Sequence, residues 1–239
     1  MRFLKSGLDQ ALTALFVLSV SAIFLANEDP FARNALCAYA QFPCFESAHA
    51  RALNKILYDI SIGSVTSLIF YVLIVRLPDF QKRKRIKNSL RTHYKIFKED
   101  CIAIFIAVAD GSYEGGFPET LSEQCKFKDY FKQRISDSQD RWDAFANNLN
   151  PTYLRELVIR MEIFRDEIAF VLNNTDIPNE EAFEFFKRLS SAIYSNKGIT
   201  LDYDSIKSLC NFLWSVFAGW DWVSGYRERD IIQEMIEAI

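Results

Sequence analysis

Two uncharged apolar runs near the start of the chain constrain its fold more than any other feature. Residues 10–27 carry no charged side chain over eighteen positions, and residues 60–75 form a second uncharged run of sixteen. At about 1.5 Å per helical residue, the first run covers about 27 Å, close to the roughly 30 Å of a bilayer core. Residues 56–58 and Leu77 lengthen the second run. We therefore expect two transmembrane helices, at about residues 8–27 and 57–77.

Charge is distributed unevenly along the rest of the chain. Residues 79–98 hold eight basic residues and one acid, whereas residues 99–239 hold fourteen Lys/Arg against twenty-five Asp/Glu. Basic residues flank membrane spans on the cytoplasmic side, and Arg2 and Lys5 precede the first run. The sequence thus predicts a membrane anchor over residues 1–78 with both ends cytoplasmic, and an external loop over residues 28–56. A cleaved signal peptide is the alternative for the first run.

A basic collar follows the second run, after Pro78, which is expected to end or kink the helix. It can be read as a contact with anionic lipid, as stop-transfer charge, or as a nucleic-acid patch. Its position beside a predicted span favours the first two, so we expect membrane lipids as partners and disfavour direct nucleic-acid binding. The collar consists of Lys82, Arg83, Lys84, Arg85, Lys87 and Arg91.

Small residues recur in the second predicted span, at Ser61, Gly63, Ser64 and Ser67, with Thr66 among them. Small side chains let membrane helices approach closely. The stripe is therefore a candidate helix-packing face, either between copies of the chain or between the two spans of one copy.

The cysteines fit the predicted orientation. Cys37 and Cys44 fall in the external loop, where a disulfide is chemically permitted, so they form a candidate disulfide pair. Cys101, Cys125 and Cys210 would remain reduced on the cytoplasmic side.

Beyond the spans the pattern predicts helices, and the fold class is all-α. Apolar residues from Ile86 to Val108 recur at spacings of three and four, which predicts a basic juxtamembrane helix over residues 79–110. An acidic cytoplasmic helical bundle over residues 111–239 should follow. Start and stop signals place its helices at about residues 151–172, 178–196, 203–218 and 221–238, with a weaker pattern over 119–146 and no convincing strand.

Aromatic residues gather near the end of the chain. Trp214, Trp220 and Trp222 are candidate residues for docking a protein partner, because tryptophan is frequent in interface hot spots. At helical spacing the same residues are also typical of a core.

No catalytic signature is present. The two histidines, His49 and His93, fall on opposite sides of the predicted membrane, and no Cys/His grouping has the spacing of a zinc site. No nucleophile elbow, kinase motif or dinucleotide fingerprint occurs. We expect a protein that is not an enzyme and that uses no cofactor or metal, although an enzyme acting on anionic phospholipid remains an alternative.

One region resembles a known group of proteins. Residues 58–63 (YDISIG), residues 69–71 (IFY), Leu77-Pro78 and residues 97–102 (FKEDCI) follow one another around the basic exit. Over about residues 56–105 the chain is similar to small two-span inner-membrane proteins of bacteria, some of which are phage-defence membrane effectors of the retron type. The resemblance implies an inner-membrane protein that partners hold silent and that damages the membrane when released. The alternative is a membrane-tethered scaffold or receptor.

Overall fold

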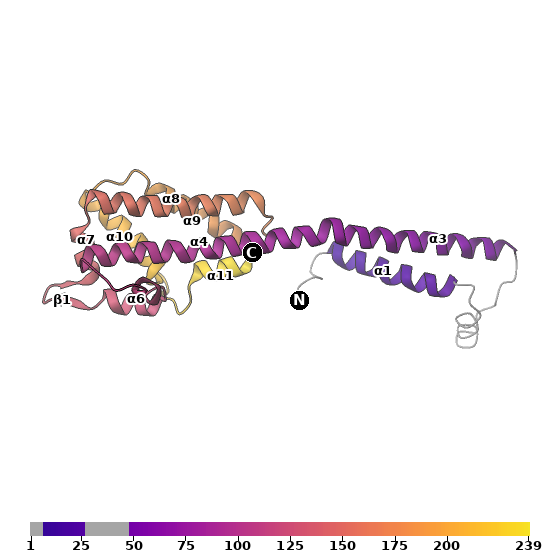
Figure 1. The fold of residues 1–239 in the computed structure, drawn as a ribbon, viewed down its shortest axis with the longest axis horizontal. Helices are drawn as coiled ribbons and strands as arrows, with labels where there is room; N and C mark the ends of the chain where they lie inside the picture. Colours follow the sequence, from indigo (N-terminus) through magenta and orange to yellow (C-terminus); the bar gives the residue numbers. More distant parts are fainter. Residues whose placement is uncertain (1–6, 27–47) are drawn as a thin grey trace. The chain divides into compact units, whose positions relative to one another are not determined.

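A computed structural model describes residues 7–26 and 48–239, and these residues are mostly helical, as predicted (Figure 1). The chain divides into two compact units, Met1–Lys82 and Arg83–Ile239, which are considered separately below. The candidate disulfide pair, Cys37 and Cys44, lies outside the described residues.

The described part of the first unit includes two helices that pack together. Helix α1 (Gly7–Ala26) packs along α3 (Ala48–Tyr71) (Figure 1). Both helices coincide with the predicted apolar runs, and α3 begins nine residues before the predicted start of its span. Uncharged apolar residues dominate α1, whereas the first turns of α3 include Arg51 and Lys55.

Pro78 does not end the helix. A π-helical turn, η1 (Val72–Arg76), follows α3, and α4 (Leu77–Ala109) continues from it without a break. Within this turn the Leu77 N–H donates to the Val72 carbonyl, five residues back. A proline ring crowds the carbonyl four residues before it and has no N–H to donate. The wider turn just before Pro78 accommodates that ring, so the helical path survives.

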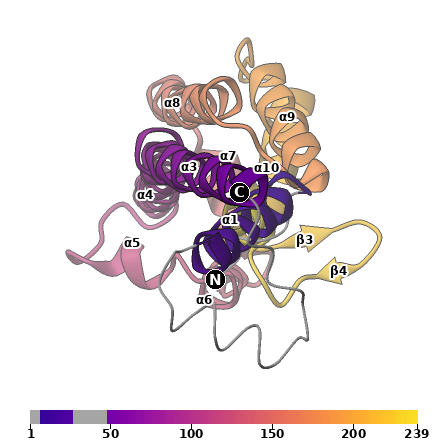
Figure 2. The same ribbon diagram turned by 90° about the vertical axis from the view of Figure 1, so that its right-hand side faces the viewer.

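The second unit forms around α4, whose buried positions include the expected Ile86, Leu90, Tyr94 and Phe97. Helix α8 packs against α9, α10 contacts α6 and α7, and α11 contacts α9. Figure 2 shows α8 and α9 on one side of this unit and α6 on the other. The helices after α4 are α5 (Phe117–Thr120), α6 (Gln124–Phe131), α7 (Arg141–Asn148), α8 (Pro151–Asn174), α9 (Glu180–Ser195), α10 (Tyr203–Phe217) and α11 (Ile231–Ala238).

Local capping explains where several of these helices begin. The Asn150 side chain accepts from the Thr152 and Tyr153 N–H groups at 3.0 and 3.1 Å, and Pro151 fills the first helical position, as predicted. For α9 the cap is Asn179, whose side chain accepts from Ala182 at 3.1 Å. The predicted helix at about residues 178–196 therefore begins two residues later than expected, at Glu180.

Two short hairpins depart from the all-helical expectation. Strand β1 (Arg134–Ser136) pairs with β2 (Gln139–Asp140), and β3 (Trp220–Asp221) pairs with β4 (Gly225–Tyr226), both antiparallel. The helix predicted over residues 221–238 therefore begins only at Ile231. In the second hairpin the Asp221 carboxylate accepts from the Val223 and Ser224 N–H groups at 2.7 and 3.0 Å. This turn chemistry competes with a helix, and Gly225 takes a left-handed φ of 74°.

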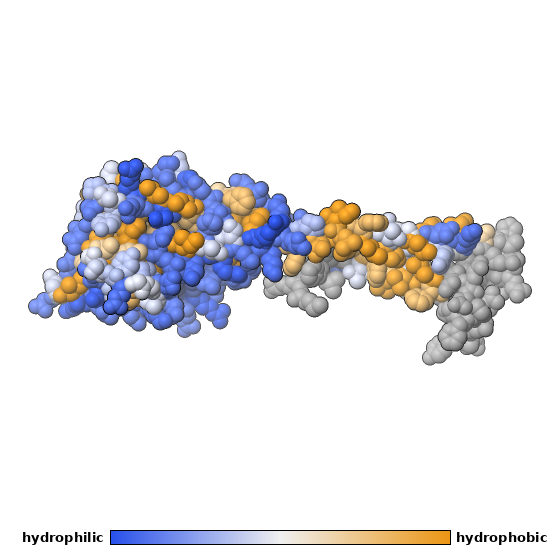
Figure 3. Space-filling view, in the orientation of Figure 1, coloured by the Kyte–Doolittle hydropathy of each residue, from blue (hydrophilic) through white to orange (hydrophobic). Residues whose placement is uncertain are grey.

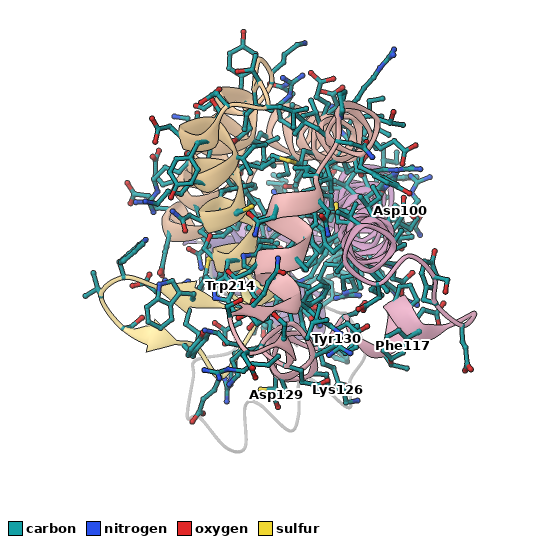
Figure 4. All side chains as sticks on the ribbon, turned by 90° about the vertical axis from the view of Figure 1, so that its left-hand side faces the viewer. Asp100, Phe117, Lys126, Asp129, Tyr130 and Trp214 are labelled. Carbon is teal, nitrogen blue, oxygen red and sulfur yellow. The ribbon has the colours of Figure 1, made fainter. Side chains whose placement is uncertain are left out.

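The core of the second unit is rich in aromatic rings. Phe105 is fully buried and packs edge-on to Phe145 and Phe217, with ring centroids 4.8 and 5.0 Å apart. Phe127, Phe131 and Trp142 also surround it. Offset and edge contacts of this kind add about 0.5–1.5 kcal/mol per pair beyond burial. At the margin of this core, Figure 4 shows Phe117 beside Tyr130, whose rings are 5.2 Å apart.

Candidate functional site

One helical stretch of the described residues, Lys55–Ala109, is long and apolar enough by length and composition to cross a membrane. The apolar stretch Gln10–Phe24 is shorter than a span requires. Only 6% of the most apolar window in the long helix is buried, so this window is not the core helix of the described fold. Figure 3 shows apolar side chains gathered over α1 and α3. The exposed residues of the stretch include Ile56, Leu57, Ile60, Ile69, Phe70, Leu73 and Ile74.

The stripe of small residues is divided between two sides of α3. Ser61 is 4% exposed, and Ser19 of α1 is 6% exposed. Both serines therefore lie on the packed sides of their helices. The Ser61 and Ser64 hydroxyls donate to the carbonyls of Leu57 and Ile60, at 2.7 and 2.9 Å within α3. These two hydroxyls are therefore satisfied within their own helix rather than across a helix contact.

Gly63 and Ser67 lie on the open side of α3 instead. Both are exposed, and a Cβ added at Gly63 would meet nothing within 4 Å. Thr66 is exposed as well. The four candidate residues thus do not share one face: Ser61 is buried and Ser64 is half-buried, whereas Gly63 and Ser67 form a separate surface that the described residues leave uncovered.

The basic collar is also divided. Arg83 forms an ion pair with Asp176 at 3.6 Å, whereas Lys87 and Arg91 both contact Glu237 of α11. Among the described residues Lys82, Lys84 and Arg85 have no ion-pair partner, and all three are exposed. The collar thus holds three cations that are neutralised within the second unit and three that are available to an external anion.

A buried polar cluster joins α4 to the start of α11. The Tyr94 hydroxyl donates to both Asp230 carboxylate oxygens, at 3.0 and 2.8 Å, and the Lys98 ammonium contacts one of them at 3.1 Å. Lys98 also donates to the Ser122 carbonyl at 3.0 Å. Burial, followed by the charge of Asp230, raises the pKa of Tyr94 well above its ordinary value.

Asp230 itself caps α11 by accepting from the Ile232 and Gln233 N–H groups, at 3.1 and 3.3 Å. Lys98 and Asp230 line a hollow of about 410 Å³ with Cys125 and Glu228. The contacts of Tyr94 and Lys98 with Asp230 therefore attach the start of α11 to α4, and the second contact of Lys98 attaches the Ser122 backbone to the same cluster.

The three tryptophans proposed for docking occupy different environments. Trp214, labelled in Figure 4, is half-buried against Trp142 and Phe127, with ring centroids 5.0 and 5.8 Å away. Trp220 is half-buried in the hairpin, 4.7 Å from the Tyr226 ring. Trp222 is 82% exposed, and its neighbour Val223 is 97% exposed. The core interpretation thus fits Trp214, and the docking interpretation fits the hairpin tip at Trp222.

The sequence analysis did not identify several residues of these surfaces. A local signal for the hairpin tip at Val223 was present, because Asp221 and Gly225 are residue types that favour a turn. Asp230 is followed by two isoleucines, which is a recognisable helix start. Glu237 had no such signal. Among the described residues, no group of His, Cys, Asp and Glu could hold a metal ion.

Comparison with protein-family models, with curated proteins and with solved structures gives no match to this chain.

Proposed function

We propose that this chain is a non-enzymatic bacterial membrane effector with two spans, whose helical unit engages a protein partner on the cytoplasmic side. Its spans would associate between copies or perturb the inner membrane. The absence of a catalytic motif in the sequence supports a role in binding rather than catalysis. The place in anti-phage defence follows only from the resemblance over residues 56–105.

The uncovered Gly63–Ser67 surface is the observation that carries this proposal. If the small residues of α3 served only to pack the two spans of one copy, Gly63 and Ser67 would lie on the packed side of the helix with Ser61. They are exposed instead, four residues apart on one side of the helix. In lipid, a small-xxx-small surface favours close helix association, so a second copy of the chain is the natural occupant.

The decisive experiment follows the membrane potential of cells that express the chain alone or with its genomic neighbours. Gly63→Leu and Ser67→Leu should each abolish depolarisation, because the larger side chain separates the associating helices. Insertion should persist, since leucine makes the span more apolar. Ile62→Leu and Ile69→Leu are matched controls at exposed positions of the same helix, and both should retain activity.

Two results would count against the effector. One is a chain that never depolarises cells under any trigger. The other is full activity in both leucine variants, which would remove the oligomer mechanism. Among the described residues nothing lies within 4 Å of a Cβ added at Gly63, so the base of a larger side chain has room within one copy.

The proposed topology has its own test. The proposed topology has the second unit in the cytoplasm and the loop with Cys37 and Cys44 outside, and the basic collar supports it because cytoplasmic flanks are rich in Lys and Arg. An impermeant thiol reagent applied to intact cells after reduction should modify these two cysteines and spare Cys125. Cys125 is the suitable internal reporter because its side chain is exposed, whereas Cys210 is buried. Modification of Cys125 in intact cells would show that the second unit lies outside the cytoplasm and would refute the proposed orientation.

A passive scaffold or receptor is the second candidate, and the exposed hairpin tip favours it. Trp222 and Val223 project from a turn that Asp221 and Gly225 define, so a partner would meet a preorganised apolar knob. Under this alternative, Trp222→Ala abolishes capture of the partner and the span substitutions are harmless. If the chain is an effector, activity should instead be lost on substitution of Gly63 or Ser67 in the span.

A further inference from the structure

Helix α11 is attached to one face of α4 by acidic groups at its two ends. On α4 the contacting residues are Lys87, Arg91, Tyr94 and Lys98, which recur at helical spacing and so share a face. On α11 the contacting residues are Asp230, just before the helix, and Glu237 in its last turn. We call these two sets of contacts the clasp. Its two ends differ in burial: the Lys98 and Asp230 side chains are 11% and 12% exposed, whereas that of Glu237 is 52% exposed.

The exposed end of the clasp already binds an anion. The Glu237 carboxylate lies between two cations: one oxygen contacts Arg91, and the other is 3.4 Å from the Lys87 ammonium. Lys87 also donates to the Glu237 backbone carbonyl at 2.6 Å. The hydrogen bond from Arg91 holds the pKa of Glu237 below its ordinary value, so the carboxylate is charged at neutral pH. A guanidinium beside an ammonium is also an arrangement that binds phosphate oxygens.

The position of Lys87 and Arg91 along α4 indicates which external anion could compete with Glu237. Phe80, an apolar side chain that is 48% exposed, lies seven residues before Lys87 in the same helix. Lys84 and Arg85 lie between them without ion-pair partners among the described residues. If the apolar stretch is in a bilayer, the phosphate groups of its lipids are external anions that can compete with Glu237 for Lys87.

We propose that anionic phospholipid competes with Glu237 for Lys87 and Arg91, so that a negatively charged leaflet releases the last turn of α11 while Asp230 holds its first turn. The proposal rests on the membrane anchoring proposed above. It adds to that function a lipid-sensitive element in the second unit. When the last turn is released, the neighbouring Ile236, which is fully buried, loses part of its cover. The surface beneath α11 then becomes accessible to a partner.

Hydrogen exchange of the full chain in nanodiscs tests the competition directly. One preparation has phosphatidylcholine alone, and the other has equal parts of phosphatidylcholine and phosphatidylglycerol. Near an anionic leaflet each of the two cations contributes about a fivefold factor, and the factors multiply, so the amides of residues 235–239 should exchange roughly 25-fold faster in the anionic discs. High salt should reduce the difference, because it screens the lipid charge. The amides of α8 should exchange equally in both preparations.

Matched variants separate the clasp from the rest of the collar. Glu237→Gln should exchange quickly in both kinds of disc, because the last turn is no longer held by charge. Lys87→Gln with Arg91→Gln should do the same. Lys84→Gln with Arg85→Gln removes two collar cations that hold nothing in α11, so these amides should remain slow in phosphatidylcholine and should still respond to phosphatidylglycerol.

The outcomes distinguish this proposal from the one on which it rests. A chain that does not enter nanodiscs at all would refute membrane anchoring. A chain that enters both kinds of disc with equal exchange at residues 235–239 would refute the lipid competition and leave the anchoring intact. Fast exchange in phosphatidylcholine discs after addition of inorganic phosphate, or of duplex DNA, would also overturn it, because the ligand would then be soluble phosphate or nucleic acid.

Discussion

Replacing Trp214 and Trp222 by alanine, one at a time, separates the core tryptophan from the candidate docking tryptophan. Trp214 is half-buried and contacts Trp142 and Phe127, and the Lys132 ammonium lies 5.5 Å from its ring. Removing a fully buried tryptophan costs about 3–5 kcal/mol. Because Trp214 retains part of its surface in water, we expect Trp214→Ala to lower the free energy of unfolding by about 2–3 kcal/mol.

Replacing Trp222 should cost much less free energy of unfolding than replacing Trp214. It is 82% exposed, and its ring contact is with Trp220, with centroids 6.3 Å apart. Exposed substitutions away from caps and cores usually change stability by less than about 0.5 kcal/mol. Trp222→Ala should therefore leave the stability of the chain nearly unchanged, although it removes most of the apolar surface of the hairpin tip.

Thermal unfolding of the full chain in detergent, followed by far-UV circular dichroism, measures both variants. For a unit of this size a loss of 1 kcal/mol lowers the midpoint by about 2–4 °C, so Trp214→Ala should lower it by roughly 4–12 °C. Trp222→Ala should lower it by less than about 2 °C. Equal shifts, or a larger shift for Trp222→Ala, would refute the assignment of the two residues. If the assignment holds, any loss of partner binding in Trp222→Ala can be attributed to the binding surface.

Three further predictions concern individual side chains. A maleimide should modify Cys125 much faster than Cys210, because Cys125 is exposed while burial raises the pKa of the Cys210 thiol to about 12; comparable rates by mass spectrometry would contradict this. Tyr94→Phe should lower the free energy of unfolding by about 1–3 kcal/mol in urea titrations, since it leaves the Asp230 carboxylate without its hydroxyl donor. The pKa of Glu237 is lowered on folding, so its stabilisation is fully present above the ordinary value of 4.5 and is lost as the pH falls through the lower folded pKa. The stability difference between the native chain and Glu237→Gln should therefore shrink below about pH 4.5, and a constant difference across that range would argue against the ion pair.

Most helices of the second unit were predictable because their signals are local. The apolar residues of α4 recur at spacings of three and four residues. Asn150 and Pro151 mark the start of α8, since Asn150 caps the helix and Pro151 is its first residue. The hairpin at Trp220–Tyr226 was missed although its signal is also local. Apolar residues on both sides of it suggested a continuous helix, and the Asp221 turn with Gly225 interrupts that pattern. At this position the turn chemistry of Asp221 outweighs the apolar periodicity, so the chain forms a hairpin in place of a helix.

The clasp could not have been predicted from sequence. Glu237 is 146 residues from Arg91, and Asp230 is 136 residues from Tyr94, so nothing in the local pattern of either segment marks the pair. An acidic stretch of 25 carboxylates among residues 99–239 offers many equivalent partners for the collar cations. The choice of Glu237 and Asp176 depends on the packing of α11 and on the path of the chain after α8.

The division of the small residues on α3 follows partly from helix geometry. Successive residues of an α-helix are turned by about 100°, so Ser61 and Gly63 differ by about 200° and cannot share a face. Two pairs remain, Ser61 with Ser64 and Gly63 with Ser67, and both satisfy the requirement for close helix packing. Sequence alone does not choose between them, because both pairs consist of small residues. In the structure Ser61 is buried and Gly63 is open. Since α1 already occupies the packed side of α3, an associating helix would have to come from outside the described part of this copy. The Gly63–Ser67 side is where a leucine substitution tests that association without disturbing the contact with α1.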